Sequence, residues 1–427
     1  MTTTPDSDAR HRSVSILRDP VFGRLWFVQA ATQVGGNMAL YALTVLVFTT
    51  TRSNAAVSAL VMSFLLPTIA LSAVAGVVVD RLNLRWALVG PNVARAVMTL
   101  GLALAGPNVA VLLLLNLGIS FTTVMLTPAE AAMIPRIVGR AQLETAMGVF
   151  NLTLQASFAV GFAFLGPLLV TIAGPSFVLG VVTILYVAAT IACLLLPSAP
   201  PASVAPGTAS RALHEPLRQL REGFAAIKEN REVSRPLLHL AASASLVGVL
   251  GVLGPALAVS VGLEPDRLVV VVLPLGLGVV AGVLGLRRFG RGVPRRRSAE
   301  AGLIGFGFLT IGVAAVGPVL GGQGLAIAVV VVLAFLAGAA YAATTVSAQT
   351  ALFEHMPAAA RGRIFGVLAS IVSAASLLPI LVAGPLADRI SASLVLVIVG
   401  AAVIAIGFAS ARLFGPTADG VTADGPT

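Results

Sequence analysis

The amino-acid sequence predicts an all-α membrane protein whose twelve transmembrane helices form two pseudo-symmetric six-helix bundles. Its composition is the first observation: charged residues make up 10% of the 427 residues and hydrophobic residues make up 57%. Average soluble proteins carry about 25% charged residues. This chain therefore has too few charges to cover a soluble globule of its length, and most of its surface must face lipid.

The second observation is a series of twelve apolar runs, because a helix of about 20 apolar residues crosses a bilayer. The first six cover residues 22–49, 56–79, 86–105, 109–127, 147–172 and 176–196. The second six cover 236–261, 268–286, 301–319, 325–352, 364–386 and 392–414. We therefore expect bundles at 22–196 and 236–414, a cytoplasmic N-terminal tail at 1–21 and a disordered cytoplasmic tail at 415–427.

The polar segment between the two sets, residues 197–235, is predicted to be a linker. It begins with a Pro/Ala/Ser-rich stretch, which is typical of linkers. It continues with Leu217, Leu220, Phe224 and Ile227 at helical spacing among basic residues. That pattern predicts an amphipathic helix on the membrane surface.

The third observation is the position of the basic residues, which give the chain a net charge of +10. Twenty-three of the 27 fall in one alternating set of loops and tails, against Arg52, Arg267 and Arg389 in the other set and Arg95 within a span. Cytoplasmic loops of membrane proteins carry the excess of Lys and Arg. The sequence thus predicts a multi-pass protein of the cytoplasmic membrane with both termini inside. The charge is explained by topology, and no nucleic-acid partner is expected.

The two halves share a spacing of glycine and proline. Gly148, Gly166 and Pro167 lie 218 residues before Gly366, Gly384 and Pro385. Transporters built from repeats carry their substrate site at the repeat interface near the bilayer midplane. The matched spacing therefore favours a transporter.

Polar side chains recur every three or four residues along three spans, which places each set on one helix face. Hydrocarbon penalises polar side chains that do not face protein or water, so these faces are predicted to line a substrate cavity. For each Ser or Thr the alternative is a hydrogen bond to a carbonyl of its own helix. The sets are Gln29, Gln33, Asn37 and Tyr41 in the first span, Asn116, Ser120, Thr123 and Thr127 in the fourth, and Tyr341, Thr345 and Gln349 in the tenth.

Three ionisable residues within spans are candidates for proton coupling. Glu130 continues the polar face of the fourth span, and burial away from water favours the protonated form of a carboxylic acid. Its alternative is a solvated carboxylate paired with Arg136. Arg95 lies in the third span with a coupling role or a structural, snorkelling role. His239, at the start of the seventh span, is the weaker second proton carrier.

Other residues indicate packing or exclude functions. Gly278 and Gly282 form a small-xxx-small pair, which favours close helix contact. Cys193 is the only cysteine, which excludes an intrachain disulfide and a Cys-cluster metal site. The spans hold no paired carboxylates, metal-spaced His cluster or Ser-His-Asp set, so we expect neither an enzyme nor a cofactor.

Three motifs carry a resemblance to a known family. Gly76-Val-Val-Val-Asp80-Arg81, followed by Arg85, resembles the loop between helices 2 and 3 of the major facilitator superfamily. The stretches 127–135 and 361–366, the latter containing Arg361 and Arg363, resemble its exporter-type branch of macrolide and siderophore efflux proteins. The resemblance implies that helices 1, 4, 7 and 10 line the central cavity.

The helices that carry these motifs also contain residues with predicted roles. Asp80 is expected to face the N-terminus of helix 11, beside Arg361 and Arg363, and to hold the cytoplasmic side closed; the alternative is a solvated turn. The antiporter signature of helix 5 is partial: Gly161, Gly166 and Pro167 are present, but Val170 and Thr171 stand where paired glycines occur. Gly384 and Pro385 repeat the Gly-Pro pair in helix 11.

We therefore expect a monomeric secondary active transporter that works by alternating access. It is predicted to export a hydrophobic or amphipathic small molecule, with proton coupling. The alternatives are an uptake permease, an uncoupled facilitator, or a non-transporting membrane sensor or assembly protein.

Overall fold

The computed structural model describes residues 16, 18–139, 142–200, 231–289, 293–321, 324–354 and 361–413. Within them lie twelve helices that are long and apolar enough to cross a membrane, which confirms the predicted spans. The predicted amphipathic helix of residues 217–227 and the tail at 415–427 lie outside the described residues.

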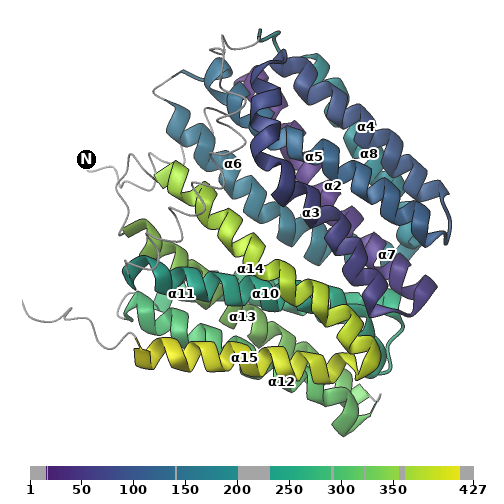
Figure 1. The fold of residues 1–427 in the computed structure, drawn as a ribbon, viewed down its shortest axis with the longest axis vertical. Coiled ribbons are helices and arrows are strands. Elements are labelled where there is room, and N and C mark those ends of the chain that lie inside the picture. Colours follow the sequence, from purple (N-terminus) through teal and green to yellow (C-terminus); the bar gives the residue numbers. More distant parts are fainter. Residues whose placement is uncertain are drawn as a thin grey trace, which may run out of the picture. The chain divides into compact units, whose positions relative to one another are not determined.

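Figure 1 shows the helices of the first six spans. Five of these spans begin after a polar side chain that caps the helix or at a proline. Asp19 accepts hydrogen bonds from the amides of Val21 and Phe22, and Asn108 accepts one from Val111. Such caps satisfy amides that have no partner within the helix. The elements are α2 (Pro20–Thr51), α3 (Asn54–Asp80), α4 (Leu84–Leu104), α5 (Val109–Ile137), α6 (Leu143–Phe158), η2 (Ala159–Leu165), α7 (Gly166–Ala173) and α8 (Pro175–Leu194).

The fifth span is one helix interrupted by a π-helical stretch. Elements α6, η2 and α7 follow each other without a loop, and the amide of Gly166 donates to the carbonyl of Gly161, five residues earlier. Pro167 follows directly. Proline has no amide hydrogen and its ring crowds the carbonyl four residues earlier, which explains why the regular ladder changes at this point.

The second six spans run through residues 231–413. A single 3₁₀ turn, η3, precedes the eighth span. The elements are α10 (Arg231–Ser260), η3 (Pro265–Leu268), α11 (Val269–Phe289), α12 (Arg295–Leu320), α13 (Gly324–Glu354), α14 (Arg361–Arg389) and α15 (Ala392–Leu413).

The chain divides into two compact units. Unit 1 consists of residues 1–218, 252–273 and 380–389, and unit 2 of 219–251, 274–379 and 390–427. In unit 1, α8 packs against α2 and α4, and α5 packs against α3 and α4. In unit 2, α12 packs against α13 and α15 around Phe306 and Leu303.

Close helix contact in unit 2 follows the predicted glycine pair. A Cβ atom at Gly278 or Gly282 of α11 would overlap the carbonyls of Phe335 and Ala339 on α13, and one at Gly338 would overlap Leu275. The two backbones therefore touch, as the small-xxx-small pattern predicts.

Candidate functional site

A buried arginine lies at the centre of a polar cluster in unit 1. Arg95, on α4, is only 4% exposed. Its Nη2 atom donates to the hydroxyl of Tyr186 at 2.7 Å and to the carbonyl of Thr32 at 3.3 Å. The guanidinium carbon lies 4.1 Å from the centroid of the Tyr186 ring, a cation–π distance. Arg95 thus joins α4 to α2 and α8 inside the bundle.

Glu130 brings a fourth helix, α5, to this cluster. The residue is 5% exposed, whereas Arg136, its alternative partner at the end of the same helix, is exposed. The charge of Arg95 acts on the Glu130 carboxylate, and that carboxylate in turn acts on the thiol of Cys193. Arg95 and Glu130 are therefore a buried cation and a buried acid whose charges act on each other, and we call this group the Arg95–Glu130 cluster.

Several polar atoms around the cluster lack a hydrogen-bond partner within the described residues. They are Nε of Arg95, Oδ1 of Asn92, Oγ1 of Thr99 and Oε1 of Gln29. Asn92 and Thr99 lie on the same face of α4 as Arg95, and the Asn92 amide also donates to the carbonyl of Leu88. Buried polar atoms are nearly always bonded to protein or to water. These atoms therefore mark places where internal water can bind.

The polar face of the fourth span joins α5 to α3. Asn116 donates to the carbonyl of Leu60 at 3.2 Å and to the hydroxyl of Ser63 at 2.8 Å, and Ser120 donates to the carbonyl of Phe64. These side chains hold the two helices together.

The last two side chains of that face behave differently. Thr123 donates to the carbonyl of Ile119 in its own helix, which is the alternative to lining a cavity. Thr127 is exposed. On the face predicted to line the cavity, two side chains thus pack against α3, one is hydrogen-bonded within its own helix and one is exposed.

The polar face of the first span lies against the fifth span. Gln29 is 5% exposed and donates to the carbonyl of Phe150, while Asn37 donates to the carbonyl of Gln33 in its own helix. Tyr41 is fully buried, and its ring lies 5.6 Å from that of Phe162.

The glycines of the partial helix-5 signature make this contact possible. A Cβ at Gly161 would overlap Val34 and Asn37, and one at Gly166 would crowd Tyr41. Pro167 begins α7 directly after Gly166. Gly384 of helix 11 is equally close to a neighbouring helix, since a Cβ there would overlap the carbonyl of Asn54; Pro385, next to it, is exposed.

In the tenth span, Tyr341, Thr345 and Gln349 are half-buried. The Tyr341 ring lies 5.6 Å from that of Phe306, and Thr345 donates to the carbonyl of Tyr341 in its own helix.

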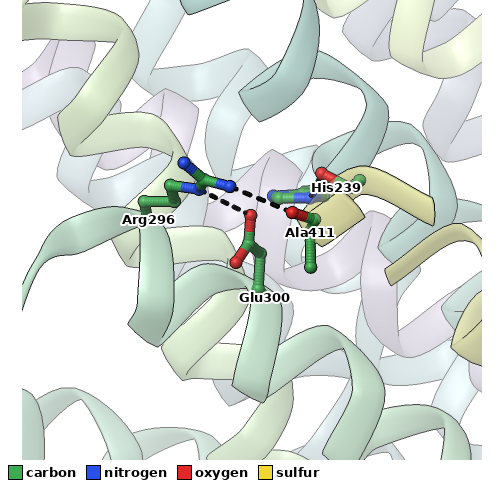
Figure 2. Close-up of polar contacts among 5 residues, drawn as sticks. His239, Arg296, Glu300 and Ala411 are labelled. Atoms are coloured by element: carbon green, nitrogen blue, oxygen red, sulfur yellow. Dashed lines mark hydrogen bonds and ion pairs between the residues drawn. The ribbon is translucent and has the colours of Figure 1, made fainter. Parts of the chain in front are cut away.

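His239 belongs to a different polar group, in unit 2 (Figure 2). It is 1% exposed, and its Nε2 atom lies 2.9 Å from the hydroxyl of Ser410. Beside it, Arg296 donates to Glu300 at 2.9 Å and to the carbonyl of Ala411 at 3.2 Å. The ring is therefore held inside the bundle of unit 2 and faces cations, since the charges of Arg235 and Arg296 act on it.

The predicted switch residues at the end of α3 are at the surface. Gly76 is half-buried, Asp80 and Arg81 are exposed, and the Arg85 guanidinium lies 5.7 Å from the centroid of the Trp86 ring. Arg361 and Arg363 begin α14, but their side chains lie outside the described residues. The contact between Asp80 and the start of helix 11 therefore stays a prediction.

Sequence reasoning missed two polar residues that the structure connects to other helices. Tyr186 binds Arg95, and Asp388 binds the start of α3. Tyr186 had one available signal, because a tyrosine hydroxyl in an apolar span needs a partner. For Asp388 the signal was its place at the end of Gly384-Pro-Leu-Ala-Asp388-Arg389, which repeats the spacing of Gly76 to Arg81.

Solved structures with the same fold include several transporters. The nucleoside transporter NupG has a TM-score of 0.71 at 15% identity, with 93% of this chain and all of NupG covered. A POT family transporter in complex with 5-aminolevulinic acid has a TM-score of 0.67 at 13% identity, with 91% and 94% covered. A bacterial homolog of the human lysosomal transporter Spinster has a TM-score of 0.64 at 17% identity, with 92% and 96% covered. No curated protein sequence matches the chain.

The sequence itself matches a family model. The model describes the Major Facilitator Superfamily, and it matches residues 25–379. This range includes the loop motif from Gly76 to Arg85 and the whole Arg95–Glu130 cluster. The chain therefore belongs to the major facilitator superfamily, whose members are secondary transporters of small molecules and not enzymes.

Proposed function

We propose that this transporter is a proton-coupled exporter of hydrophobic or amphipathic small molecules, of the exporter-type branch. We place it in the cytoplasmic membrane as a monomer with both termini inside. The observation that carries the proton coupling is the buried Arg95–Glu130 cluster. The resemblance of residues 127–135 and 361–366 to efflux proteins supports the direction.

The cluster supports proton coupling because different groups compensate the burial of its two charges. A buried carboxylate is stable as an ion only when a positive charge or hydrogen bonds compensate the loss of water. When Glu130 is ionised, Arg95 supplies that charge. When Glu130 takes up a proton, Arg95 is left with the Tyr186 hydroxyl and the Thr32 carbonyl.

Proton binding can therefore change helix packing. Arg95 lies on α4, Tyr186 on α8, Thr32 on α2 and Glu130 on α5. Protonation of Glu130 changes the strength of its interaction with Arg95 relative to the bonds from Arg95 to Tyr186 and Thr32. This change shifts the preferred packing of the four helices. A proton can move a transporter between states only through such a difference in interaction energy.

The nature of the substrate follows from what the spans lack. Glu130 is the one acid on the polar helix faces, and the charge of Arg95 acts on it. A multiply cationic compound would need several acids to balance its charge. Neutral, amphipathic compounds with a single polar group are therefore the expected substrates.

The test is transport into inside-out vesicles containing the wild-type protein, Glu130→Gln or Glu144→Gln. Glu144 is the matched control, because it is an exposed acid at the start of α6 in the same unit. The panel contains hydrophobic antibiotics, a nucleoside and a dipeptide, with and without a proton uncoupler. We expect uncoupler-sensitive accumulation of an antibiotic by wild type and Glu144→Gln, and loss of gradient-driven accumulation in Glu130→Gln.

The same assay separates the alternatives. Accumulation that the uncoupler leaves unchanged, or that Glu130→Gln keeps at the wild-type level, overturns proton coupling through this cluster. Substrate movement only out of inside-out vesicles indicates uptake in the cell. Movement that never exceeds equilibrium indicates an uncoupled facilitator, and no movement of any compound favours a sensor or assembly protein.

A further inference from the structure

The C-terminal end of α14 is bound to the N-terminal end of α3 by one carboxylate. Asp388 Oδ1 accepts from the amide of Asn54 at 2.7 Å and from its side-chain amide at 2.9 Å. Asp388 Oδ2 accepts from the hydroxyl of Ser53 at 2.6 Å and from the amide of Ala55 at 3.0 Å. Both contacting segments belong to unit 1.

This arrangement is a complete cap of a helix by a residue from a distant helix. The first amides of a helix have no internal partners and carry a partial positive charge. Here Asp388 accepts hydrogen bonds from the amides of Asn54 and Ala55, and the hydroxyl oxygen of Ser53 accepts one from the amide of Ala56. Hydrogen bonds to a charged acceptor are stronger than neutral ones. The amides at the start of α3 are therefore best satisfied only while Asp388 is in place.

The packing below the carboxylate follows the same helix face. Ile380, Gly384 and Asp388 are four residues apart and share one face of α14. The carbonyl of Ile380 accepts from Ser58 on α3 at 2.8 Å. A Cβ at Gly384 would overlap both Asn54 and Ser58. Two turns of α14 thus fit closely along the first turns of α3.

The contact joins the two halves of the sequence. Asn54 begins the second span, and Asp388 is the next-to-last residue of the eleventh. The sequence from Gly384 to Arg389 has the same Gly-xxx-Asp-Arg spacing as Gly76 to Arg81 at the other end of the second span. Alternating access requires that contacts between the halves at one membrane face break when that face opens. A cap made of a few hydrogen bonds at a helix end can break without disturbing either helix.

We propose that Asp388 is a conformational latch that keeps the outer ends of α3 and α14 together, and that it releases the N-terminus of α3 once in every transport cycle. It rests on the proposed orientation, in which these ends face outward. On this reading, helices 2 and 11 carry two reciprocal latches: Asp388 caps helix 2 on the outer face, and Asp80 is its predicted counterpart on the cytoplasmic face.

The first experiment measures opening of the outer face without any substrate. The reporter is Ser58→Cys, because Ser58 is 2% exposed and lies directly under the latch. The native Cys193 is fully buried, so the wild-type protein, which lacks the reporter, serves as the blank. Intact cells are treated with a membrane-impermeant maleimide. Adding Asp388→Ala is expected to speed labelling by about tenfold, the order implied by the loss of hydrogen bonds to a charged group, and Asp388→Asn by less.

The matched control is Asp19→Ala, which removes a carboxylate cap of the same kind from α2 but within one half. It is expected to leave labelling at the rate of the Ser58→Cys parent. Equal labelling in Asp388→Ala and this parent overturns the latch. Equal acceleration by Asp19→Ala also overturns it, since loss of any helix cap would then have the same effect.

The second experiment asks whether the contact must open during transport. Ser53→Cys and Asp388→Cys are combined and joined by a short, reducible bifunctional thiol reagent. Transport is expected to stop in the joined protein and to return after reduction, while each single variant is unaffected by the reagent. Undiminished transport by the joined protein overturns the proposal. Labelling needs neither substrate nor proton gradient, so a failed efflux assay and a failed latch are distinguishable.

Discussion

At the scale of single residues, the energetics of unit 1 depend on how Arg95 is compensated. Moving an ion out of water costs several kcal/mol unless good hydrogen bonds and an opposite charge replace the water. Arg95 obtains the Tyr186 hydroxyl, the Tyr186 ring and the Thr32 carbonyl, together with the charge of Glu130. The bond to the Tyr186 hydroxyl is the shorter of the two hydrogen bonds of Arg95, which makes it the contact to remove first.

We expect Tyr186→Phe to destabilise the protein, because it removes that hydrogen bond and keeps the ring. A hydrogen bond to a charged group contributes about 1.5–3 kcal/mol, so the melting temperature in detergent should fall by several degrees. Tyr41→Phe is the contrasting variant. The Tyr41 hydroxyl is buried without a partner among the described residues, and its removal is expected to be neutral or stabilising. Equal melting temperatures for the two variants would show that the Arg95 contact contributes nothing.

The sequence allowed half of this cluster to be predicted. Arg95 and Glu130 stand out as charges within apolar spans, and the expense of intramembrane charge makes each a candidate without further information. Their surroundings did not follow. Tyr186 lies 91 residues from Arg95, and Asn54 lies 334 residues from Asp388. Helical periodicity relates residues on one helix and says nothing about which two faces meet.

At the scale of helices, glycine decides where backbones touch. Gly278, Gly282 and Gly338 allow α11 and α13 to meet without intervening side chains. In lipid there is little hydrophobic drive between helices, so close van der Waals packing carries the association. The small-xxx-small pattern predicted this contact because it depends on spacing within one helix.

We expect Gly278→Ala to weaken unit 2, since the new methyl group would overlap the backbone of Phe335. Overpacking of a close contact costs about 1–3 kcal/mol. Gly285→Ala, on the same helix, is the control because nothing lies near its Cβ position. Thermal unfolding of both variants in detergent measures the difference. A melting temperature for Gly278→Ala equal to that of Gly285→Ala contradicts the close approach of α11 to α13.

The π-helical stretch of the fifth span shows what helix-level prediction leaves out. The sequence predicts a single span at 147–172, and Gly161, Gly166 and Pro167 are visible in it. Pro167 predicts a defect in the hydrogen-bond ladder. Whether this defect is a kink or a π-helical turn does not follow from the sequence. In the structure a π-helical stretch occurs where Gly161 and Gly166 fit closely against α2.

At the scale of the whole molecule, the composition together with the positions of the apolar runs predicted the number of spans. Few charges and long apolar runs leave a chain with no other stable arrangement in lipid, because every backbone group there must be satisfied within its own helix. The division into units that mix both halves did not follow from composition. Residues 252–273 and 380–389 join unit 1 through side-chain contacts such as that of Asp388.

The orientation of the molecule is the last prediction, and it rests on arginine. Loops with many Lys and Arg stay in the cytoplasm, and Arg81 and Arg85 lie in such a loop. We expect Leu82→Cys, at an exposed site in that loop, to react with an impermeant maleimide only in inside-out vesicles. Thr50→Cys, exposed at the end of α2, should react only in intact cells.

The two sites are separated by one span, so they must respond oppositely whatever the orientation. Leu82→Cys reacting in intact cells and Thr50→Cys in inside-out vesicles would invert the topology. The Asp388 latch would then lie on the cytoplasmic face and Asp80 on the outer face. The reciprocal design of helices 2 and 11 would survive that result, but each latch would close the opposite gate, and the direction in which the proton drives transport would have to be assigned again.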